Sequence, residues 1–297
     1  MQASYRQIQA MGTRLDIVVP DIEEVKFGQL MSVVSSEVGR IERMLSYFDS
    51  TSEISLINAI GFAGPVALEA ELGSIFRELK AYHEETGGYF DPTLRPVYDF
   101  HRSKIKGKNS AEQSDSEKSE DIVIPDELRA KVGMDKVMLG PEGISFLQEG
   151  MKIDLGGYGK GYAIKCLLPI FEEYDIARAL ISFGESLVYG LGSHPFGPVW
   201  KVSIPFSGSG ETAEFELKDL ALSTSGNSLN NQKKFANSGH IVNPVTLQMK
   251  EKQGLVSVKS ADPVRAEVYS TALFSAGSES MEAIVENAPD LEVLWSQ

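Results

Sequence analysis

The sequence is poor in cysteine, in positive charge and in long apolar runs. Its 297 residues include one cysteine, Cys166, which excludes an internal disulfide and a cysteine-built zinc site. No stretch of 18 apolar residues occurs, so no segment is predicted to span a bilayer. The first 11 residues also lack the apolar core of a secretory signal. These features fit a cytoplasmic protein, or an exported one whose signal has been removed, and do not separate the two.

Positive charge is scarce relative to negative charge. The chain has 28 lysines and arginines against 42 aspartates and glutamates, a formal net charge of −14. Such an excess repels nucleic-acid backbones and anionic membrane surfaces, so we expect neither as a partner. A polyphosphate ligand can still bind, but it needs a local cation or backbone N–H groups.

The apolar patterns predict an α+β fold in one domain, 1–297, because helices and strands mix without a regular βαβ order. Helices are predicted at 30–45, 54–58, 72–82, 161–174, 263–275 and 281–287. Strands are predicted at 14–19, 136–139, 144–148, 151–154, 179–183, 186–189, 200–204, 214–217, 256–258 and 291–295. Residues 103–121 are almost free of apolar side chains, which predicts a mobile surface insertion. Cys166 lies in an apolar run and is predicted to be a buried structural thiol.

A glycine-rich loop follows the strand predicted at 151–154. It reads Asp154-Leu155-Gly156-Gly157-Tyr158-Gly159-Lys160-Gly161. Glycines let backbone N–H groups turn toward a ligand, and both a helix N-terminus and Lys160 add positive potential, so the loop suits a phosphate or pyrophosphate. It matches neither the Walker A pattern nor the G-x-G-x-x-G fingerprint. A tight turn with a solvated lysine is the alternative.

Two further groups of polar residues are candidates for chemistry. Glu267 and Thr271 are four residues apart on a predicted helix, so they share a face. Their oxygens suit Mg²⁺, although an exposed glutamate and a packed threonine would give the same spacing. The hydroxyl-rich run 223–227 is suited to binding phosphate oxygens. His240 is a candidate general base, with a structural histidine as the alternative.

Two common hydrolase signatures are missing. The G-x-S-x-G elbow fails because Gly184-Glu185-Ser186-Leu187-Val188 ends in valine, so an α/β-hydrolase is not indicated. No H-E-x-x-H occurs, which excludes a zincin.

The order of short motifs carries more information than any one of them. Seven blocks occur in sequence: Met11-Gly12-Thr13, Ser52 to Asn58, Gly88 to Thr93, Asp154 to Ala163, Thr224-Ser225-Gly226, His240 to Pro244 and Ala266 to Leu273. From about Met11 to Phe274 the chain resembles the ApbE family of FAD:protein FMN transferases. The glycine-loop block is the most specific of the seven.

The resemblance implies an α+β, T-fold-like structure with largely antiparallel sheets, flanking helices and a cleft that binds FAD as substrate. It also implies Mg²⁺ at the pyrophosphate. In the family, FMN is transferred from FAD to a threonine or serine of an acceptor protein, such as a redox-complex subunit, and AMP is released. Two alternatives share this site, an Mg²⁺-dependent FAD pyrophosphatase and a catalytically silent FAD-binding protein. A scaffold without flavin is the remaining possibility.

Carried over position by position, the resemblance implies roles for individual residues. The metal ligands would be the Gly159 carbonyl, Glu267 and Thr271, and His240 would deprotonate the acceptor hydroxyl. The FAD-binding positions would be Met11, Asn58, Asp91, Gly157, Lys160, Thr224, Ser225 and Gly226.

Several positions depart from the family pattern. Glu267 and Asn243 stand where aspartate is usual, Gly159 where alanine is usual, and Ser182 to Ser186 where Asn-Leu-Gly-Gly-Asp is usual. A further motif bears on the acceptor. Family acceptors carry Ser/Thr-Gly-Ala-Ser/Thr, whereas Ser225-Gly226 is followed here by Asn227. The expected acceptor is therefore another protein.

Overall fold

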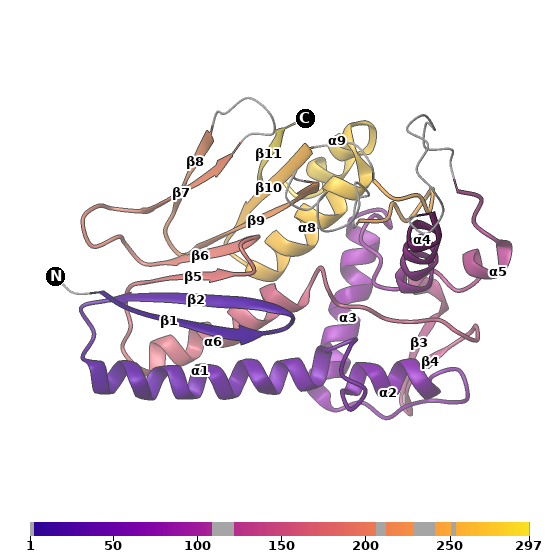
Figure 1. Cartoon of the computed structure of the whole chain (residues 1–297), viewed down its shortest axis with the longest axis horizontal. Helices are drawn as coiled ribbons and strands as arrows, with labels where there is room; N and C mark the ends of the chain where they lie inside the picture. Colours follow the sequence, from indigo (N-terminus) through magenta and orange to yellow (C-terminus); the bar gives the residue numbers. More distant parts are fainter. Residues whose placement is uncertain (1–2, 109–121, 206–211, 228–240, 251–253, 297) are drawn as a thin grey trace.

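The computed structural model describes residues 3–108, 122–205, 212–227, 241–250 and 254–296. Its main element is a seven-stranded sheet in the order β1-β2-β5-β6-β9-β10-β11, in which every neighbouring pair is antiparallel (Figure 1). The strands are β1 (Ala3–Ala10), β2 (Thr13–Pro20), β5 (Ala179–Phe183), β6 (Leu187–Leu191), β9 (Leu220–Asn227), β10 (Gly254–Ser260) and β11 (Glu292–Ser296). Two hairpins, β3 (Val137–Gly140) with β4 (Gly143–Phe146) and β7 (Trp200–Pro205) with β8 (Thr212–Leu217), complete the strands. The predicted α+β class with antiparallel sheets is confirmed.

Three helices cover one face of the main sheet: α1 (Glu24–Leu45), α6 (Gly159–Glu173) and α8 (Pro263–Ala276). In α1 the buried residues recur at helical spacing, as in Leu30, Val34, Val38 and Ile41, so one stripe of that helix faces the core. By contrast, α8 is buried on nearly all sides because it lies between β9, β10 and α6. A helix so enclosed can carry polar side chains only where they find partners.

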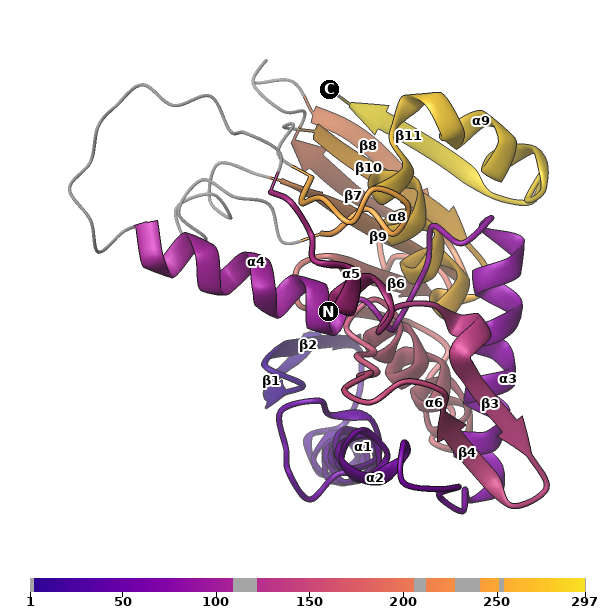
Figure 2. The same ribbon diagram turned by 90° about the vertical axis from the view of Figure 1, so that its right-hand side faces the viewer.

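In Figure 1 the β7–β8 hairpin lies to the left of the molecule, whereas the remaining helices and the β3–β4 hairpin lie to the right; Figure 2 views the molecule from that right-hand side. These helices are α2 (Glu53–Ile60), α3 (Ala70–Glu85), α4 (Arg95–Lys108), α5 (Asp126–Arg129) and α9 (Ser278–Glu286). Ser52 caps α2 by accepting a hydrogen bond from the Ser55 amide. Among the described helices, none has both the length and the apolar content that crossing a bilayer requires.

Four local predictions from the sequence differ from the structure. Strand β1 was not predicted, because it is an edge strand with mostly exposed side chains and so lacks apolar alternation. Residues 151–154 are not a strand. The predicted insertion starts too early, since residues 103–108 continue α4, and 109–121 lie outside the described residues. Cys166 is only half-buried, because it lies at the edge of the α6 core face.

Two glycines lie in the first turn of α6, and they differ in what a side chain at each position would contact. A Cβ at Gly161 would lie 2.6 Å from the Pro263 carbonyl oxygen and 2.7 Å from Cα of Val264, whereas one at Gly159 would meet only the terminal methyl of Met11. Backbone cannot move aside as a flexible methyl can. We expect Gly161→Ala to lower the free energy of unfolding by about 1–3 kcal/mol, despite the better helix propensity of alanine.

Gly159→Ala is the matched control and is expected to stay within about 0.5 kcal/mol of the wild type. Urea unfolding followed by circular dichroism measures both. Equal losses for the two variants would contradict the close approach of α6 to α8 described above.

Candidate functional site

The glycine loop meets α8 at the N-terminus of α6. A Cβ built on Gly157 would lie 3.1 Å from Oγ1 of Thr271 and 3.3 Å from its Cγ2. The backbone of the loop therefore touches the Thr271 side chain directly, although 113 residues separate them in sequence. The loop and the polar face of α8, both singled out in the sequence, form one site.

Glu267 is the charged centre of this site. Its side chain is buried, with 4% exposed, and each carboxylate oxygen has a partner. Oε2 accepts a hydrogen bond from the Gly161 amide at 2.6 Å, and Oε1 accepts one from the Lys160 ammonium. Lys160 also donates to the Gly156 carbonyl at 3.3 Å. The exposed glutamate of one alternative and the solvated lysine of the other are therefore not observed, because the two side chains neutralise each other at the helix start.

Hydroxyl groups from α8 and β9 lie beside Glu267. Oγ of Ser270 is 2.9 Å from Oγ of both Ser223 and Ser225. Thr271 donates to the backbone carbonyl of Glu267 at 3.0 Å, and its Oγ1 is 3.5 Å from Oγ of Ser225. Ser225 thus joins the hydroxyl cluster beside Glu267.

The other two members of the 224–226 run lie differently. Side chains alternate across a strand, so Thr224 points to the opposite face of β9, where its Oγ1 is 2.9 Å from Oγ of Ser257. The implied role of the Thr224 side chain in a phosphate cradle is therefore not supported. Gly226 packs so closely against the Gly254 carbonyl and Leu255 that no side chain fits there, which assigns it a structural role.

Two hairpin turns border the start of α6. Met11, in the β1–β2 turn, has a left-handed φ of 51° and places its terminal methyl against Gly159. The Met11 amide donates to Oε1 of Glu42 at 2.9 Å, which fixes the turn. In the β5–β6 turn, a Cβ on Gly184 would lie 3.4 Å from Cδ of Lys160. The β1–β2 turn therefore borders Gly159, the first residue of α6, and the β5–β6 turn borders the aliphatic part of the Lys160 side chain.

The segment before the loop is held by side chains from two helices, α2 and α4. Asn58 of α2 donates to the Ile153 carbonyl at 2.8 Å and accepts from the Ile153 amide at 2.6 Å. Asp154 accepts from Arg95 of α4 at 2.8 Å and from the Gly156 amide at 3.0 Å. Both functional groups of the Asn58 side chain are thus engaged with protein, so this residue positions the loop.

Asn58→Ala would leave both polar groups of the buried Ile153 backbone without their side-chain partner. We expect the free energy of unfolding to fall by about 2–5 kcal/mol, since each unsatisfied buried group costs about 1–3 kcal/mol. Asn287→Ala is the control, because the exposed Asn287 amide donates only to the Ala283 carbonyl, and it is expected to change stability by less than about 0.5 kcal/mol. Urea unfolding of both variants checks this, and a neutral Asn58→Ala would refute the anchoring role.

The loop is also anchored from α3. Tyr158 is fully buried, and its hydroxyl donates to Glu78. Burial, together with this hydrogen bond, raises the pKa of Tyr158 far above its ordinary value. The phenol therefore stays neutral and keeps its donor role at any physiological pH.

Asp91 lies apart from the Glu267 cluster. Its carboxylate accepts from the amide and hydroxyl of Thr93 at 2.8 and 2.6 Å, and burial raises its pKa. It borders a cavity of about 260 Å³ whose lining also includes His83, Arg129, Gly133 and the turn at 244–247. The structure thus places Asp91 beside a cavity with a mixed lining of charged and apolar residues, and no contact among the described residues joins it directly to Glu267.

His240, the predicted base, lies outside the described residues. The chain resumes at Ile241, and the side chain of Asn243 ties it to α8 by donating to the Ser275 carbonyl at 2.8 Å. Its oxygen accepts from the amides of Val245 and Thr246. An aspartate at this position has no N–H to donate to Ser275, which gives a physical reason for asparagine here.

The residues that surround Glu267 offer oxygen atoms that fit a divalent cation. One carboxylate and the neighbouring hydroxyl and loop oxygens are the hard donors that Mg²⁺ prefers. The Lys160 ammonium stands at that carboxylate, so the position already holds positive charge. Among the described residues no three His, Cys, Asp or Glu side chains gather as a metal group. An ion here would therefore take most of its ligands from water and a bound diphosphate.

Sequence reasoning missed several residues near the site. Ser270 lies three residues after Glu267, so the helical spacing alone could have predicted that the two side chains share a face. Arg95 had no such signal, because its partner Asp154 is 59 residues away. The Arg95 guanidinium also lies 4.1 Å from the ring centre of Tyr47 and 5.0 Å from that of Phe48. Phe48 is 81% exposed, so an exposed aromatic side chain lies beside Arg95, which bonds to Asp154 at the start of the loop.

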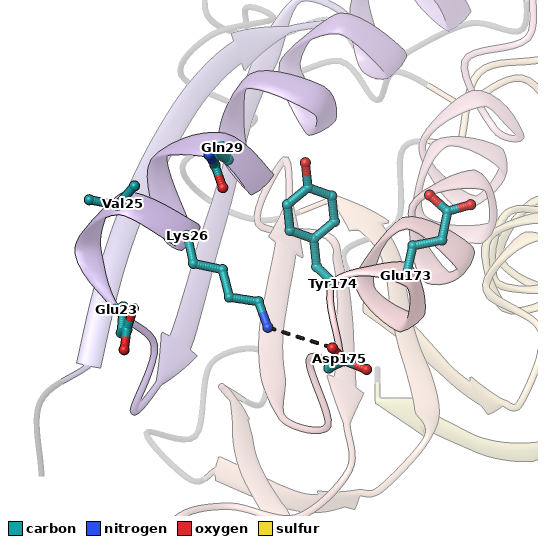
Figure 3. Close-up of a pocket in the computed structure, with 7 residues that line it drawn as sticks. All are labelled: Glu23, Val25, Lys26, Gln29, Glu173, Tyr174 and Asp175. Carbon is teal, nitrogen blue, oxygen red and sulfur yellow. Dashed lines mark ion pairs between the residues drawn. The ribbon is translucent and has the colours of Figure 1, made fainter.

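A surface pocket of about 370 Å³ lies at the other end of α6 (Figure 3). It is lined by Glu23, Val25, Lys26, Gln29, Glu173, Tyr174 and Asp175, and Lys26 pairs with Asp175 at 3.8 Å. The 15 residues of α6 separate it from Gly159 by roughly 20 Å at 1.5 Å per residue. It is therefore not part of the Glu267 site.

Comparisons with known proteins identify the family of this chain. A sequence model of the ApbE family matches residues 11–295. The chain belongs to the ApbE family. The resemblance inferred from the motifs is thereby confirmed, and it extends beyond the predicted limit at Phe274 to the last strand.

Related ApbE proteins have been named for their activity. Proteins called FAD:protein FMN transferase from Klebsiella pneumoniae and Escherichia coli are each 24% identical, over 93% of this chain and 79% of theirs. The structure of the flavin transferase ApbE from Vibrio cholerae superposes with a TM-score of 0.79 at 20% identity, covering 99% of this chain and 93% of that one. The Thermotoga maritima ApbE protein gives 0.78 at 22%, covering 99% and 94%. These ApbE structures share the fold described above.

Proposed function

We propose that this protein transfers FMN from FAD to a serine or threonine hydroxyl of an acceptor protein and releases AMP, with Mg²⁺ at the site. The observation that carries the proposal is the contact of the Gly157 turn with Thr271, next to the buried Glu267. It brings the anion-binding loop and the cation-binding side chains to one place. Membership of the ApbE family and the names of its relatives support the same activity.

The reaction exchanges the phosphoanhydride bond of FAD for a phosphoester bond to the acceptor. The acceptor oxygen bonds to the phosphorus on the FMN side of FAD, the bond from that phosphorus to the bridging oxygen breaks, and AMP leaves with the bridging oxygen. The acceptor proton passes to a base, for which His240 is the candidate. Such transfer depends mostly on positioning and on stabilisation of developing negative charge.

The residues of this chain supply the positioning. We infer that the diphosphate lies against the first turn of α6, where the loop amides and Lys160 offer positive potential. Glu267 and Thr271, with the Gly159 carbonyl, would hold Mg²⁺, which would neutralise charge on the diphosphate as the bond to AMP breaks. The exposed Phe48 ring near Arg95 provides a flat apolar surface that suits the flavin ring.

Intact-mass measurement tests the proposal. The protein is incubated with FAD, Mg²⁺ and an acceptor that carries a Ser/Thr-Gly-Ala-Ser/Thr segment. The account predicts an acceptor heavier by one FMN less one water, with one AMP released for each acceptor modified. Free FMN with an unmodified acceptor would identify a pyrophosphatase instead, and FAD that binds but stays intact would identify a silent flavin-binding protein.

A further inference from the structure

The Lys160–Glu267 pair has a consequence for how a metal ion reaches the site. Glu267 is buried, with 4% of its side chain exposed, and Lys160 is 19% exposed. A buried carboxylate without a counter-charge is strongly disfavoured. In the structure that counter-charge is the Lys160 ammonium, while the second carboxylate oxygen is bonded to the Gly161 amide. The carboxylate therefore has no oxygen free of a donor.

Lys160 is placed so that it has two possible anionic partners. It is the second residue of α6, at the positive N-terminal end of the helix, which suits a diphosphate. Its flexible four-carbon side chain carries a compact charge. That side chain lies beside the Gly184 turn and is not enclosed in the hydrophobic core. A diphosphate at the helix start would thus compete with Glu267 for the same ammonium.

We propose that Lys160 and the divalent cation are alternative partners of Glu267. Lys160 neutralises Glu267 while the site is empty, moves to the diphosphate when FAD binds, and so frees the carboxylate for the ion. This inference rests on the proposed function, because FAD is the ligand that draws Lys160 away. It predicts that FAD and the ion bind with positive coupling and that the free protein binds the ion weakly.

The geometry accounts for this ordering in simple terms. Two cations at one buried carboxylate repel each other, so the ion must displace the ammonium in the empty site. When the diphosphate has taken the ammonium, that cost disappears. Coupling between two ligands is reciprocal, so the ion must tighten FAD binding by the same factor by which FAD tightens binding of the ion.

Mn²⁺ binding, followed by electron paramagnetic resonance of the free ion, measures this without any turnover. For the wild type we expect binding to tighten at least tenfold when a slowly reacting FAD analogue with a methylene-bridged diphosphate is present. In Lys160→Met the buried carboxylate loses its resident cation. Without nucleotide, this variant is expected to bind Mn²⁺ at least tenfold more tightly than the wild type, and to show little coupling.

Two further variants make the test specific. Lys201→Met removes a lysine from an exposed pair with Glu214 on β7 and β8 and is expected to bind Mn²⁺ as the wild type does. Lys160→Gln is measured as well, so that a folding defect in Lys160→Met, detected by circular dichroism, does not decide the result. In both Lys160 variants the added substitution Glu267→Gln is expected to abolish the tightened Mn²⁺ binding.

The competition is overturned if folded Lys160 variants bind Mn²⁺ no more tightly than the wild type without nucleotide. The exchange on FAD binding is overturned if the wild type binds Mn²⁺ equally well with and without the analogue. A wild type that binds neither FAD nor the analogue would overturn both the proposed function and the exchange. In that case the comparison of wild type and Lys160 variants without nucleotide still decides whether Lys160 and the ion compete for Glu267. Flavin transfer combined with unchanged Mn²⁺ affinities would refute this inference alone.

Discussion

Replacement of Glu267 by glutamine is expected to lower kcat/KM for FAD at saturating Mg²⁺ by at least about 100-fold, which corresponds to about 3 kcal/mol of transition-state stabilisation. Glutamine keeps an oxygen that can accept from the Gly161 amide, so the start of α6 is retained. It removes the only negative charge that contacts Lys160 among the described residues. Without Mg²⁺, FAD is expected still to bind this variant because Lys160 and the positive end of α6 remain, but the tightening of FAD binding by the ion is expected to be lost.

Glu267→Asp is the control for this prediction. It keeps the charge and introduces the residue that is usual in the ApbE family, so we expect it to retain activity within about tenfold of the wild type. Initial rates of acceptor flavinylation over a range of Mg²⁺ concentrations measure both variants. Full activity of Glu267→Gln, with unchanged dependence on Mg²⁺, would contradict the role proposed for this carboxylate.

The second large effect is expected where the loop contacts α8. A valine at Gly157 would force its branched carbons toward Oγ1 and Cγ2 of Thr271, which already lie 3.1 and 3.3 Å from a Cβ at that position. The loop or the threonine must then move, and a displacement of about 1 Å costs catalysis on the order of 100-fold. Gly157→Ala, with a single added carbon, is expected to show a smaller loss.

Gly156→Ala is the matched control one residue earlier. Its Cβ would meet only Oδ1 of Asp154 at 3.4 Å, an ordinary contact, and its backbone needs no left-handed φ. We expect flavin transfer within about threefold of the wild type. Rates for the three variants, compared with their unfolding midpoints, separate a local defect at the site from general destabilisation. Equal activity of Gly157→Val and Gly156→Ala would show that the contact with Thr271 is unimportant.

Local sequence patterns were sufficient to predict most helices and strands and the two halves of the site. The buried positions of α1 repeat at helical spacing, and Asp262 followed by Pro263 marks the start of α8. The relation between Glu267 and Thr271 was also local, because both lie on one helix face. Gly156 to Gly161 indicated an anion-binding loop for the same reason, since a few adjacent residues specify that backbone.

Long-range partners could not be predicted from these patterns. The Lys160–Glu267 pair spans 107 residues, and the Asn58 bonds to the Ile153 backbone span 95. Nothing in the sequence near Lys160 distinguishes a solvated lysine from one that neutralises a buried carboxylate, because the distinction depends on where α8 packs. The orientation of Thr224 was missed for a related reason, since the pleat of β9 and not its composition decides which hydroxyls face α8.

The net charge of −14 makes the local positive charge of Lys160 especially important for binding a diphosphate. A chain so acidic repels a diphosphate at long range, so the favourable terms must be local. We infer that they are concentrated at one helix start, in the form of the positive N-terminal end of α6, the Lys160 ammonium and a carboxylate that would hold a cation. The central claim is therefore that one ion and one diphosphate meet between Gly157 and Thr271.

A crystal soaked with Mn²⁺ and a methylene-bridged FAD analogue tests that claim most directly, because the anomalous signal of Mn²⁺ locates the ion. The account predicts a peak with a carboxylate oxygen of Glu267 and Oγ1 of Thr271 within about 2.0–2.5 Å and with diphosphate oxygens completing its ligands. A peak elsewhere, or a diphosphate bound away from the Gly157 turn, would contradict it.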